Sequence, residues 1–307
     1  MSLTLYLFCL LGLLLDAVVG EPRRWHPLVG FGKLADALAQ RLNRNPPGRW
    51  AVAAGGLAVV LLTVPVLAML VVVFALLPAW GDGMVSVIGL WLVVGRRSLV
   101  EHALAVQVPL QAGESALARE QVGRIVSRDC SALDEAGIAR AATESVLENG
   151  ADALFASLFW FVVAGLPGAL LHRLVNTLDA MWGYRNARFE RFGKVAARLD
   201  DVMGWLPARL TAWGYALCGH LPRARRCWRR QAPACDSPNA GPVMAAGAGA
   251  LGVLLGGPAH YHGQYKDKPV LGEGRPATAE SIGAAIRLLH RTLLLWLGAM
   301  ACLVWLT

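Results

Sequence analysis

The stretch Trp50-AVAAGGLAVVLLTVPVLAMLVVVFALLPAWGDGMVSVIGLWLVV-Gly95 decides the fold class of this chain, because it contains a single charged residue, Asp82. A helix needs about 20 apolar residues to cross a bilayer, so the stretch is long enough for two crossings. Turn-forming residues and an interfacial tryptophan occur within it, in Pro78-Ala-Trp-Gly-Asp-Gly83. We therefore predict a transmembrane helical hairpin with its turn at 78–83.

The composition of the whole chain also indicates a membrane protein. Of its 307 residues, 56% are hydrophobic and 16% are charged, and the mean hydropathy is +0.47. These values exclude a disordered or fibrous protein and disfavour a soluble one. Lys and Arg number 29 against 21 Asp and Glu, a net charge of +8. In an apolar chain this excess indicates positively charged loops that face the cytoplasm, and we expect no nucleic-acid partner.

The distribution of Lys and Arg selects the membrane spans. The basic residues gather in the segments 20–50, 96–150, 172–200, 220–235 and 258–292. All of these segments lie on the cytoplasmic side if the chain crosses four times, at roughly 3–20, 51–74, 76–95 and 286–306. Both termini then lie outside. The apolar residues 153–171 form a re-entrant or surface-lying hairpin that turns at Gly165-Leu-Pro-Gly168.

The predicted fold class is all-α, a polytopic integral membrane protein with about four transmembrane helices and a membrane-seated helical cytoplasmic domain. We expect three parts. Residues 1–95 carry the N-terminal transmembrane helices and a basic cytoplasmic loop at 21–49, residues 96–285 form a membrane-associated helical catalytic domain, and residues 286–307 form the C-terminal transmembrane helix. No alternation typical of strands is recognisable. The expected location is the cytoplasmic (inner) membrane, with the active site on the cytoplasmic side.

A helix is predicted over residues 131–149, between the capping signal Ser131-Ala-Leu-Asp134 and a stop at Asn149-Gly150. Helical spacing places Arg140, Glu144 and Glu148 on one face of this helix. One interpretation is a solvated face on which Arg140 pairs with Glu144. The other is a row of functional carboxylates.

More carboxylates and amides lie on both sides of the apolar hairpin. Asn149 and Asp152 precede it, and Asn176, Asp179, Asp200 and Asp201 follow it. Oxygen ligands in this number suit Mg²⁺, which is often held by one or two carboxylates together with substrate phosphates. The pattern is therefore compatible with a magnesium site, and a solvated, salt-bridged helix face is the alternative interpretation of the same acids.

Candidate anion sites lie further along the chain. Between Tyr184 and Lys194 cations alternate with aromatic residues, which is typical of contact with phosphate, anionic lipid or nucleic acid. Arg209 lies in an otherwise apolar run, where an ionisable residue indicates function. The segment Ser237-Pro-Asn-Ala-Gly241 either caps a helix or offers its hydroxyl, amide and N–H groups to a phosphate. The chain has no GxxxxGK[ST] motif, so any use of ATP needs a different kind of site.

Five groups of residues carry a resemblance through their order and spacing. They are Asp16-Ala-Val-Val-Gly-Glu-Pro-Arg-Arg-Trp-His-Pro27, Glu144-Ser-Val-Leu-Glu-Asn149 with Asp152, Asn176-Thr-Leu-Asp-Ala-Met-Trp-Gly-Tyr184, Ala197-Arg-Leu-Asp-Asp201 with Pro207-Ala-Arg-Leu-Thr211, and Ser237-Pro-Asn-Ala-Gly241. With these motifs the chain resembles the adenosylcobinamide-phosphate synthase family, the CbiB/CobD type of cobalamin biosynthesis. The resemblance runs from the first motif to about Arg291.

The resemblance implies an integral membrane ligase that joins a corrinoid, adenosylcobyric acid, to 1-amino-2-propanol or its O-phosphate as an amide. ATP is consumed, and Mg²⁺ is expected to shield its phosphates. Membrane lipid is a further expected partner, and the sequence leaves homo-oligomerisation open.

Site roles follow from the same resemblance. The acids implied in catalysis, including the base that deprotonates the amine, are Glu144, Glu148, Asp152, Asp179, Asp200 and Asp201. The resemblance implies that all of these acids except Glu144 are metal ligands. The amides implied in orienting substrates are Asn149, Asn176 and Asn239. The cations implied in binding phosphates are Arg185, Lys194, Arg198 and Arg209, with Ser237 beside them as a cofactor-binding residue.

Two other functions compete with this one. A membrane Mg²⁺-dependent prenyl- or phospho-transferase would also use Asn and Asp clusters around a lipid cavity, although its aspartates usually recur as DxxxD. A non-catalytic membrane sensor or transporter of the same superfamily would be expected to lose the acidic and Asn motifs. All of these motifs are present here.

Overall fold

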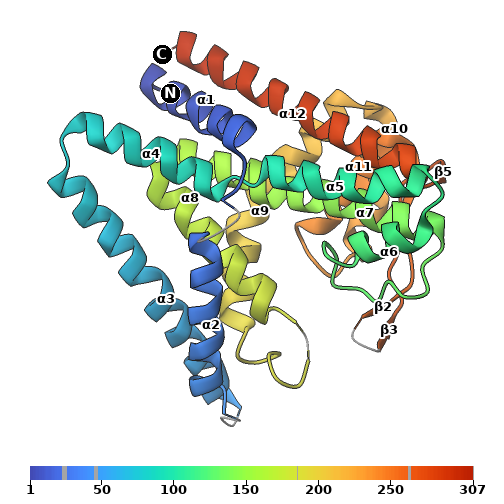
Figure 1. Ribbon diagram of the computed structural model, residues 1–307, viewed down its shortest axis with the longest axis horizontal. Coiled ribbons are helices and arrows are strands. Elements are labelled where there is room, and N and C mark those ends of the chain that lie inside the picture. Colours follow the sequence, from blue (N-terminus) through green and yellow to red (C-terminus); the bar gives the residue numbers. More distant parts are fainter. Residues whose placement is uncertain (23–25, 45–47, 185, 262–263, 307) are drawn as a thin grey trace. The chain divides into compact units, whose positions relative to one another are not determined.

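The computed structural model describes residues 1–22, 26–44, 48–184, 186–261 and 264–306. The chain is predominantly helical (Figure 1), which confirms the predicted all-α fold class. It divides into two compact units. Unit 1 comprises Met1–Gly95 and Ala156–Gly204, and unit 2 comprises Arg96–Phe155 and Trp205–Thr307. The two units therefore alternate along the chain, and the three-part division expected from the sequence stays a prediction.

Unit 1 is built from apolar helices. They are α1 (Leu3–Val19), α2 (Pro27–Leu42), α3 (Arg49–Leu76), α4 (Ala79–Val93), α8 (Ser157–Trp182) and the first part of α9 (Lys194–Cys218). Helix α4 packs against α1 and α8, and α2 packs against α3 and α8. At the centre of one core cluster the rings of Trp182 and Phe192 meet edge to face, with centroids 5.0 Å apart. A Cβ at Gly55 of α3 would collide with the Phe192 carbonyl oxygen, so glycine permits this close approach.

The predicted helical hairpin is present as α3 and α4 (Figure 1), but its turn is earlier than expected. Only Leu77 and Pro78 connect the two helices, and Pro78 is the N-cap residue of α4. Proline suits the start of a helix because its ring fixes φ and its missing N–H has no helical partner there. Trp80, Asp82 and Gly83 therefore lie in the first turns of α4 instead of forming the turn.

Among the described residues, four helical segments are long and apolar enough to cross a membrane. They are Arg49–Leu76, Ala79–Gln111, Glu135–Trp182 and Ala279–Trp305. Three of them overlap the expected spans at 51–74, 76–95 and 286–306. The expected span at 3–20 is a helix of 17 residues, α1, which is shorter than these four.

The long helical segment Glu135–Trp182 covers the region where the sequence predicts a hairpin. Its helix α8 is interrupted at Ala164 (φ −136°, ψ 21°) and Gly165 (φ 62°, ψ −160°). Gly165 adopts a positive φ that favours glycine. The predicted turn at 165–168 therefore begins at a real break, although Pro167 already lies in the second helical part. A re-entrant position in the membrane stays a prediction.

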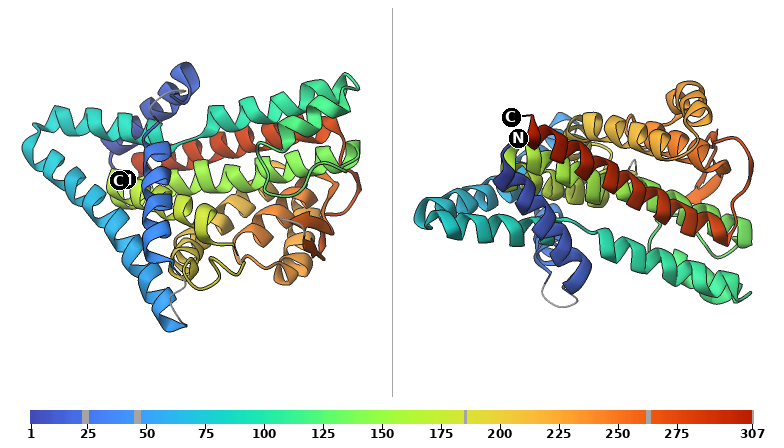
Figure 2. Two further views of the ribbon diagram at one scale, coloured as in Figure 1. Left: turned by 60° about the horizontal axis from the view of Figure 1, so that its bottom comes forward. Right: turned by 90° about the horizontal axis from the view of Figure 1, so that it is seen from above.

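Unit 2 carries the remaining elements. Its helices are α5 (Arg96–Gln111), α6 (Ser115–Val122), α7 (Glu135–Asn149), the π-helical η1 (Gly150–Ala156) up to Phe155, the second part of α9, α10 (Leu221–Gln231), the 3-10 turn η2 (Ala232–Ala234), α11 (Ala240–Leu251) and α12 (Ala279–Trp305). Helices α5, α7 and α12 run side by side (Figure 2), and α10 packs on α11.

Short strands in unit 2 were not expected from the sequence. They are β1 (Val253–Gly256), β2 (Ala259–Tyr261), β3 (Gln264–Lys266), β4 (Val270–Leu271) and β5 (Arg275–Pro276). Strand β1 lies between β4, which is antiparallel to it, and β5, which is parallel, while β2 and β3 form a separate antiparallel pair. Gly252 ends α11 in the left-handed conformation (φ 72°) and leads directly into β1. Strands of two to four residues are too short to show an alternating pattern.

Helix α7 confirms the predicted helix and its last residue, Asn149, and corrects its start. The N-cap is Asp134, whose carboxylate accepts a hydrogen bond of 2.7 Å from the N–H of Gly137, and Ser131 lies outside the helix. At the other end, Gly150 has right-handed dihedral angles and continues into the π-helical turn η1. The α-helix therefore ends at Asn149 as predicted, but the chain stays helical beyond it, and Asp152 lies on a continuous helical path from α7.

Candidate active site

In unit 1, a group of polar side chains joins α8 to the first part of α9. Asn176 donates a hydrogen bond of 3.2 Å from Nδ2 to Oδ1 of Asp200. Arg173 Nη1 donates in turn to Oδ1 of Asn176 over 3.5 Å. Asp179 lies one turn beyond Asn176 on α8, and Asp201 follows Asp200 on α9. The structure thus brings together Asn176, Asp179, Asp200 and Asp201, and Arg173 joins them as a residue that sequence reasoning did not single out.

The electrostatics of this group centre on Asp200. Burial raises the pKa of Asp200 from its ordinary value of 3.8 to about 7, and the neighbouring charge of Asp179 acts in the same direction. The hydrogen bond from Asn176 opposes the rise, and the charge of Asp201 adds to it. A carboxylate that titrates near neutral pH is suited to accept a proton from an amine, or to receive a cation that relieves the repulsion.

The donor set of unit 1 is compatible with Mg²⁺ that is shared with a substrate. Among the described residues, no group of three or more His, Cys, Asp or Glu side chains is placed to hold a metal ion unaided. Mg²⁺ usually keeps waters and binds through one or two carboxylates together with substrate phosphates. Asp200 and Asp179, which repel each other, fit that requirement, and phosphate oxygens would complete the coordination.

In unit 2, Glu144 of α7 is buried, with 5% of its surface exposed. One of its oxygens forms an ion pair with Arg128, and the other accepts a hydrogen bond from the N–H of Gly256 in β1. The expected alternative, a solvated pair of Glu144 with Arg140, is therefore wrong. Both oxygens have partners in unit 2, so Glu144 holds β1 and the loop around residue 128 against α7. No local sequence signal singles out Arg128, because it lies 16 residues from its partner in an irregular loop.

The π-helical turn η1 places Asp152 beside a buried tyrosine. Tyr215 of α9 donates from its hydroxyl to the carbonyl oxygen of Leu147 over 3.0 Å. Burial, with the charge of Asp152 as a further cause, raises the pKa of Tyr215. A Cβ at Gly150 would meet the side chain of Leu289 and come within 3.1 Å of the Tyr215 hydroxyl oxygen. Isolated π-helical turns often occur at functional sites, and this one carries a predicted site residue.

The segment before α11 brings further predicted residues of unit 2 together. The hydroxyl of Ser237 accepts hydrogen bonds from the N–H groups of Asn239 (3.3 Å) and Ala240 (3.1 Å). These bonds form a serine turn just before Asn239, the N-cap residue of α11, and they occupy two N–H groups that a phosphate cradle would have offered. Arg209 donates to the carbonyl oxygens of Trp205 (2.7 Å) and Pro238 (3.4 Å), so its side chain lies against this segment.

Glu148 approaches the same segment from α7. Burial is the largest cause of a raised pKa of the Cys235 thiol, and the charges of Asp236 and Glu148 also raise it, against Lys268, which lowers it. The neighbouring Asn149 donates from Nδ2 to the hydroxyl of Ser145 over 2.8 Å. Two predicted site residues of unit 2, Glu148 and Arg209, therefore both lie close to the segment 235–239.

Comparison with known protein families gives a match over most of the chain. A model of the family described as "CobD/Cbib protein" matches residues 9–289. The chain belongs to the CobD/Cbib family. The matched stretch contains every predicted site residue, from Glu144 to Asn239.

Curated relatives agree with the CobD/Cbib assignment. A protein of Chromobacterium violaceum named "Cobalamin biosynthesis protein CobD" is 55% identical over 293 residues, which cover 94% of each chain. A protein of the same name from Stutzerimonas stutzeri is 55% identical over 295 residues, 96% of each chain. One from Mycobacterium tuberculosis is 40% identical over 284 residues, 90% of this chain and 88% of its own. No solved structure matches the chain significantly. Membership of this family supports a role in cobalamin biosynthesis.

The remaining predicted residues lie at the start of α9 or outside the described residues. Lys194 begins α9, and Arg198 lies one turn later, shortly before the Asp200–Asp201 pair that characterises the CobD/Cbib resemblance. Arg185 lies outside the described residues. The predicted site residues therefore form two groups, one in unit 1 around Asp200 and one in unit 2 around Glu148, Asp152 and residues 235–239.

Proposed function

We propose that this chain joins the carboxylate of adenosylcobyric acid to the amino group of 1-amino-2-propanol or its O-phosphate, with consumption of ATP. Family membership supports the place in cobalamin biosynthesis, and the sequence motifs favour this particular reaction. The observation that carries the proposal is Asp200, a partly buried carboxylate with a pKa near 7 that is bordered by Asp179, Asp201 and Asn176.

The chemistry of amide formation explains why such a carboxylate is useful. A carboxylate does not react with an amine, so the corrinoid carboxylate must first attack a phosphorus atom of ATP to form a mixed anhydride. The amine then attacks the acyl carbon, the phosphate or nucleotide leaves, and the amine loses a proton. While no cation is bound to it, Asp200 titrates in the range where it can take that proton; as a metal ligand it would stay deprotonated.

We assign the remaining roles within each unit. In unit 1, Asp179, Asp200 and Asp201 are proposed metal ligands, Asn176 orients the Asp200 carboxylate, and Lys194, Arg198 and Arg185 bind phosphates. Mg²⁺, when bound, would supply positive charge that shields the phosphates of ATP. In unit 2, Glu148 and Asp152 are proposed metal ligands, Asn149, Asn239 and Ser237 contact the substrates, and Arg209 binds phosphate. Glu144 has a positioning role, because both of its oxygens are engaged within the fold.

A direct assay tests the reaction. The full chain in lipid nanodiscs is incubated with adenosylcobyric acid, ATP, MgCl₂ and, in separate reactions, 1-amino-2-propanol or its O-phosphate, and the corrinoid is analysed by mass spectrometry. We expect a product with the mass of the two substrates less one water. ADP in the mixture would indicate an acyl phosphate and AMP an adenylate. Folded protein that gives no product with either amine would contradict the proposal.

Matched carboxylate variants test the site. We expect Asp200→Asn to lower turnover by at least about 100-fold, because even outer partners of metal ligands typically cost about 10- to 100-fold when they are removed. Glu190→Gln is the control, since Glu190 is an exposed carboxylate of the same unit. Equal turnover of the two variants would show that Asp200 takes no part in the reaction.

A further inference from the structure

Helix α10 is a strongly basic helix on the surface of unit 2. Its sequence, LPRARRCWRRQ, contains five arginines and no acidic residue. Ala224 and Cys227 are fully buried, and both face Gly249 of α11, where a Cβ would meet them. With this narrow face turned inward, most of the arginine side chains project away from the core.

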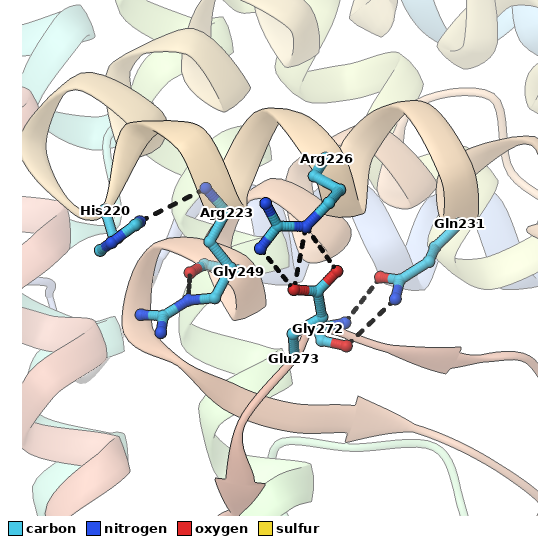
Figure 3. A network of polar contacts seen from close by, with 7 residues as sticks. All are labelled: His220, Arg223, Arg226, Gln231, Gly249, Gly272 and Glu273. Carbon is cyan, nitrogen blue, oxygen red and sulfur yellow. Dashed lines mark hydrogen bonds and ion pairs between the residues drawn. The ribbon is translucent and has the colours of Figure 1, made fainter.

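Side chains near both ends of α10 fasten the helix to the backbone of neighbouring segments, as Figure 3 shows. Arg223 donates from Nε to the carbonyl oxygen of Gly249 over 2.6 Å, near the start of the helix. At the end, the Gln231 side chain exchanges two hydrogen bonds with the backbone of Gly272, of 3.0 and 2.7 Å. Between them, Arg226 forms a forked ion pair with Glu273, with Nη2 2.7 Å from Oε2. Two of the five arginines are therefore used to hold the helix.

The other three arginines line a cavity together with Arg226. A surface cavity of about 390 Å³ is lined by Pro222, Arg225, Arg226, Arg229 and Arg230. Arg226 is neutralised by Glu273, and Arg225 lies over the ring of Trp213, with 5.5 Å between its guanidinium carbon and the ring centroid. Arg229 and Arg230 are exposed, and within the described part of the chain neither forms an ion pair with a carboxylate. The cavity thus carries a net positive charge, and arginine forks suit phosphate oxygens.

An exposed apolar stripe on α9 adjoins this cavity. Leu206, Leu210, Trp213 and Leu217 are separated by four, three and four residues, so they share one face of the helix. They are 44%, 39%, 42% and 57% exposed, respectively. The Trp213 ring meets the ring of Trp228 from α10, with centroids 5.6 Å apart. Trp213 therefore joins the apolar stripe to α10, because it contacts both Trp228 and Arg225.

We propose that α10 and the stripe on α9 form a binding site for an anionic phospholipid. Its phosphate headgroup lies among Arg225, Arg229 and Arg230, and its acyl chains cover Leu206, Leu210 and Leu217. Apolar side chains, tryptophans and arginines lie next to one another on this surface, and acyl chains, the interface and phosphates are neighbours in the same way in a bilayer leaflet. A soluble polyphosphate would satisfy the arginines but leave the adjoining apolar stripe exposed, so a lipid fits the whole surface better. The same unit carries α12, which is long and apolar enough to span a membrane.

Calorimetry on the full chain in a neutral detergent tests this site. The protein is titrated with dioctanoyl phosphatidylglycerol and, separately, with dioctanoyl phosphatidylcholine, which has the same acyl chains but no net charge. We expect tighter binding of phosphatidylglycerol, weakened by added KCl. The double variant Arg229→Gln/Arg230→Gln should bind it about 30-fold more weakly, since each basic residue at a membrane surface contributes roughly a factor of 5. Equal affinity for the two lipids would overturn the proposal.

Two matched controls separate the possible sources of phosphate. Arg124→Gln/Arg275→Gln removes the same charge from exposed positions of unit 2 outside the cavity and should leave binding unchanged. Leu210→Gln/Leu217→Gln should weaken binding of phosphatidylglycerol but not of inorganic tripolyphosphate. If the leucine variant binds the lipid as the parent does, while tripolyphosphate displaces it, the cavity is a soluble-anion site and the lipid proposal fails. The proposal does not depend on the ligase reaction, because none of these residues belongs to the candidate active site.

Discussion

The environment of Asp200 disfavours the negatively charged form of its carboxyl group. Burial and Asp179 raise its pKa, and Asn176 is the neighbour that opposes them. A neutral amide of the same shape would remove the repulsion, so we expect Asp200→Asn to melt at the same or a higher temperature than the parent at pH 8. The variant should at the same time lose ligation, which is the usual exchange of stability for function at an active site. Thermal unfolding in detergent, followed by circular dichroism, provides the measurement. A clear drop in the melting temperature would show that the Asp200 charge has a stabilising partner.

The pH dependence of stability follows from the same residue. Because the pKa of Asp200 is about 7 in the folded chain and 3.8 ordinarily, the folded state binds this proton more tightly than the unfolded state. The contribution of Asp200 to the free energy of unfolding is therefore greatest at low pH and falls as the pH rises from about 4 to about 7. The difference in melting temperature between Asp200→Asn and the parent should widen over that range. A difference between Asp200→Asn and the parent that stays constant over that range would contradict the assignment.

The ion pair of Glu144 with Arg128 is buried on both sides, with 6% and 9% of the two side chains exposed. Removing one partner of a buried pair leaves an uncompensated charge and costs about 3–5 kcal/mol. We expect Arg128→Gln to lower the free energy of unfolding by about that amount, because Glu144 then keeps a buried charge without its ion-pair partner. The double variant Arg128→Gln/Glu144→Gln should recover most of the loss, because no isolated charge remains and the amide oxygen can still accept from Gly256 N–H. Chemical denaturation of the three proteins tests this, and a double variant no more stable than the single one would contradict it.

At the scale of elements, the turn from α7 into η1 depends on a close contact with α12 and α9. A methyl group at residue 150 would meet the Leu289 side chain, so Gly150→Ala should cost about 1–3 kcal/mol of stability through overpacking. The variant Gly150→Ala/Leu289→Ala makes room for the methyl group and identifies the contact responsible. It should lose less stability than the sum of the two single variants. Additive losses in the melting temperatures would show that the two residues do not interact.

The elements also show which parts of the fold the sequence can predict. The α3–α4 hairpin was predictable because one charge in a long apolar stretch leaves few alternatives, and Asp134 lay within a recognisable capping signal. The sequence predicts that Asn176 and Asp200 are both functional, but it does not predict that they touch. A contact between residues 24 positions apart depends on how the helices pack. Tyr215 and its contact with Leu147, 68 positions away, have no local pattern at all. The short strands after Gly252 are similarly set by neighbouring backbone and not by alternation.

At the scale of the whole molecule, the positive-inside distribution makes a testable prediction about topology. The connection between α3 and α4 contains no basic residue, whereas the loop between α5 and α6 lies within the basic segment 96–150. We expect a cysteine at Leu77, in that connection, to react with a membrane-impermeant maleimide in intact cells, and a cysteine at Glu114 to react only after the membrane is opened. Both substitutions are made in a Cys302→Ser background, because Cys302 is exposed. Labelling of Glu114→Cys in intact cells would contradict the four-span topology.

The alternation of the two units along the chain has a consequence for how the protein is made. Helices α3 and α4 leave the ribosome early, but α8, which packs on both, begins only at Ser157, after a long part of the other unit has been synthesised. Until then the face of α4 that receives α8 has no protein partner, and the surrounding lipid has to cover it. Neither unit can be completed by a fragment that stops at their first boundary, Gly95. Unit 1 can therefore be completed only after translation has passed Gly204, although its first four helices are made before any part of unit 2.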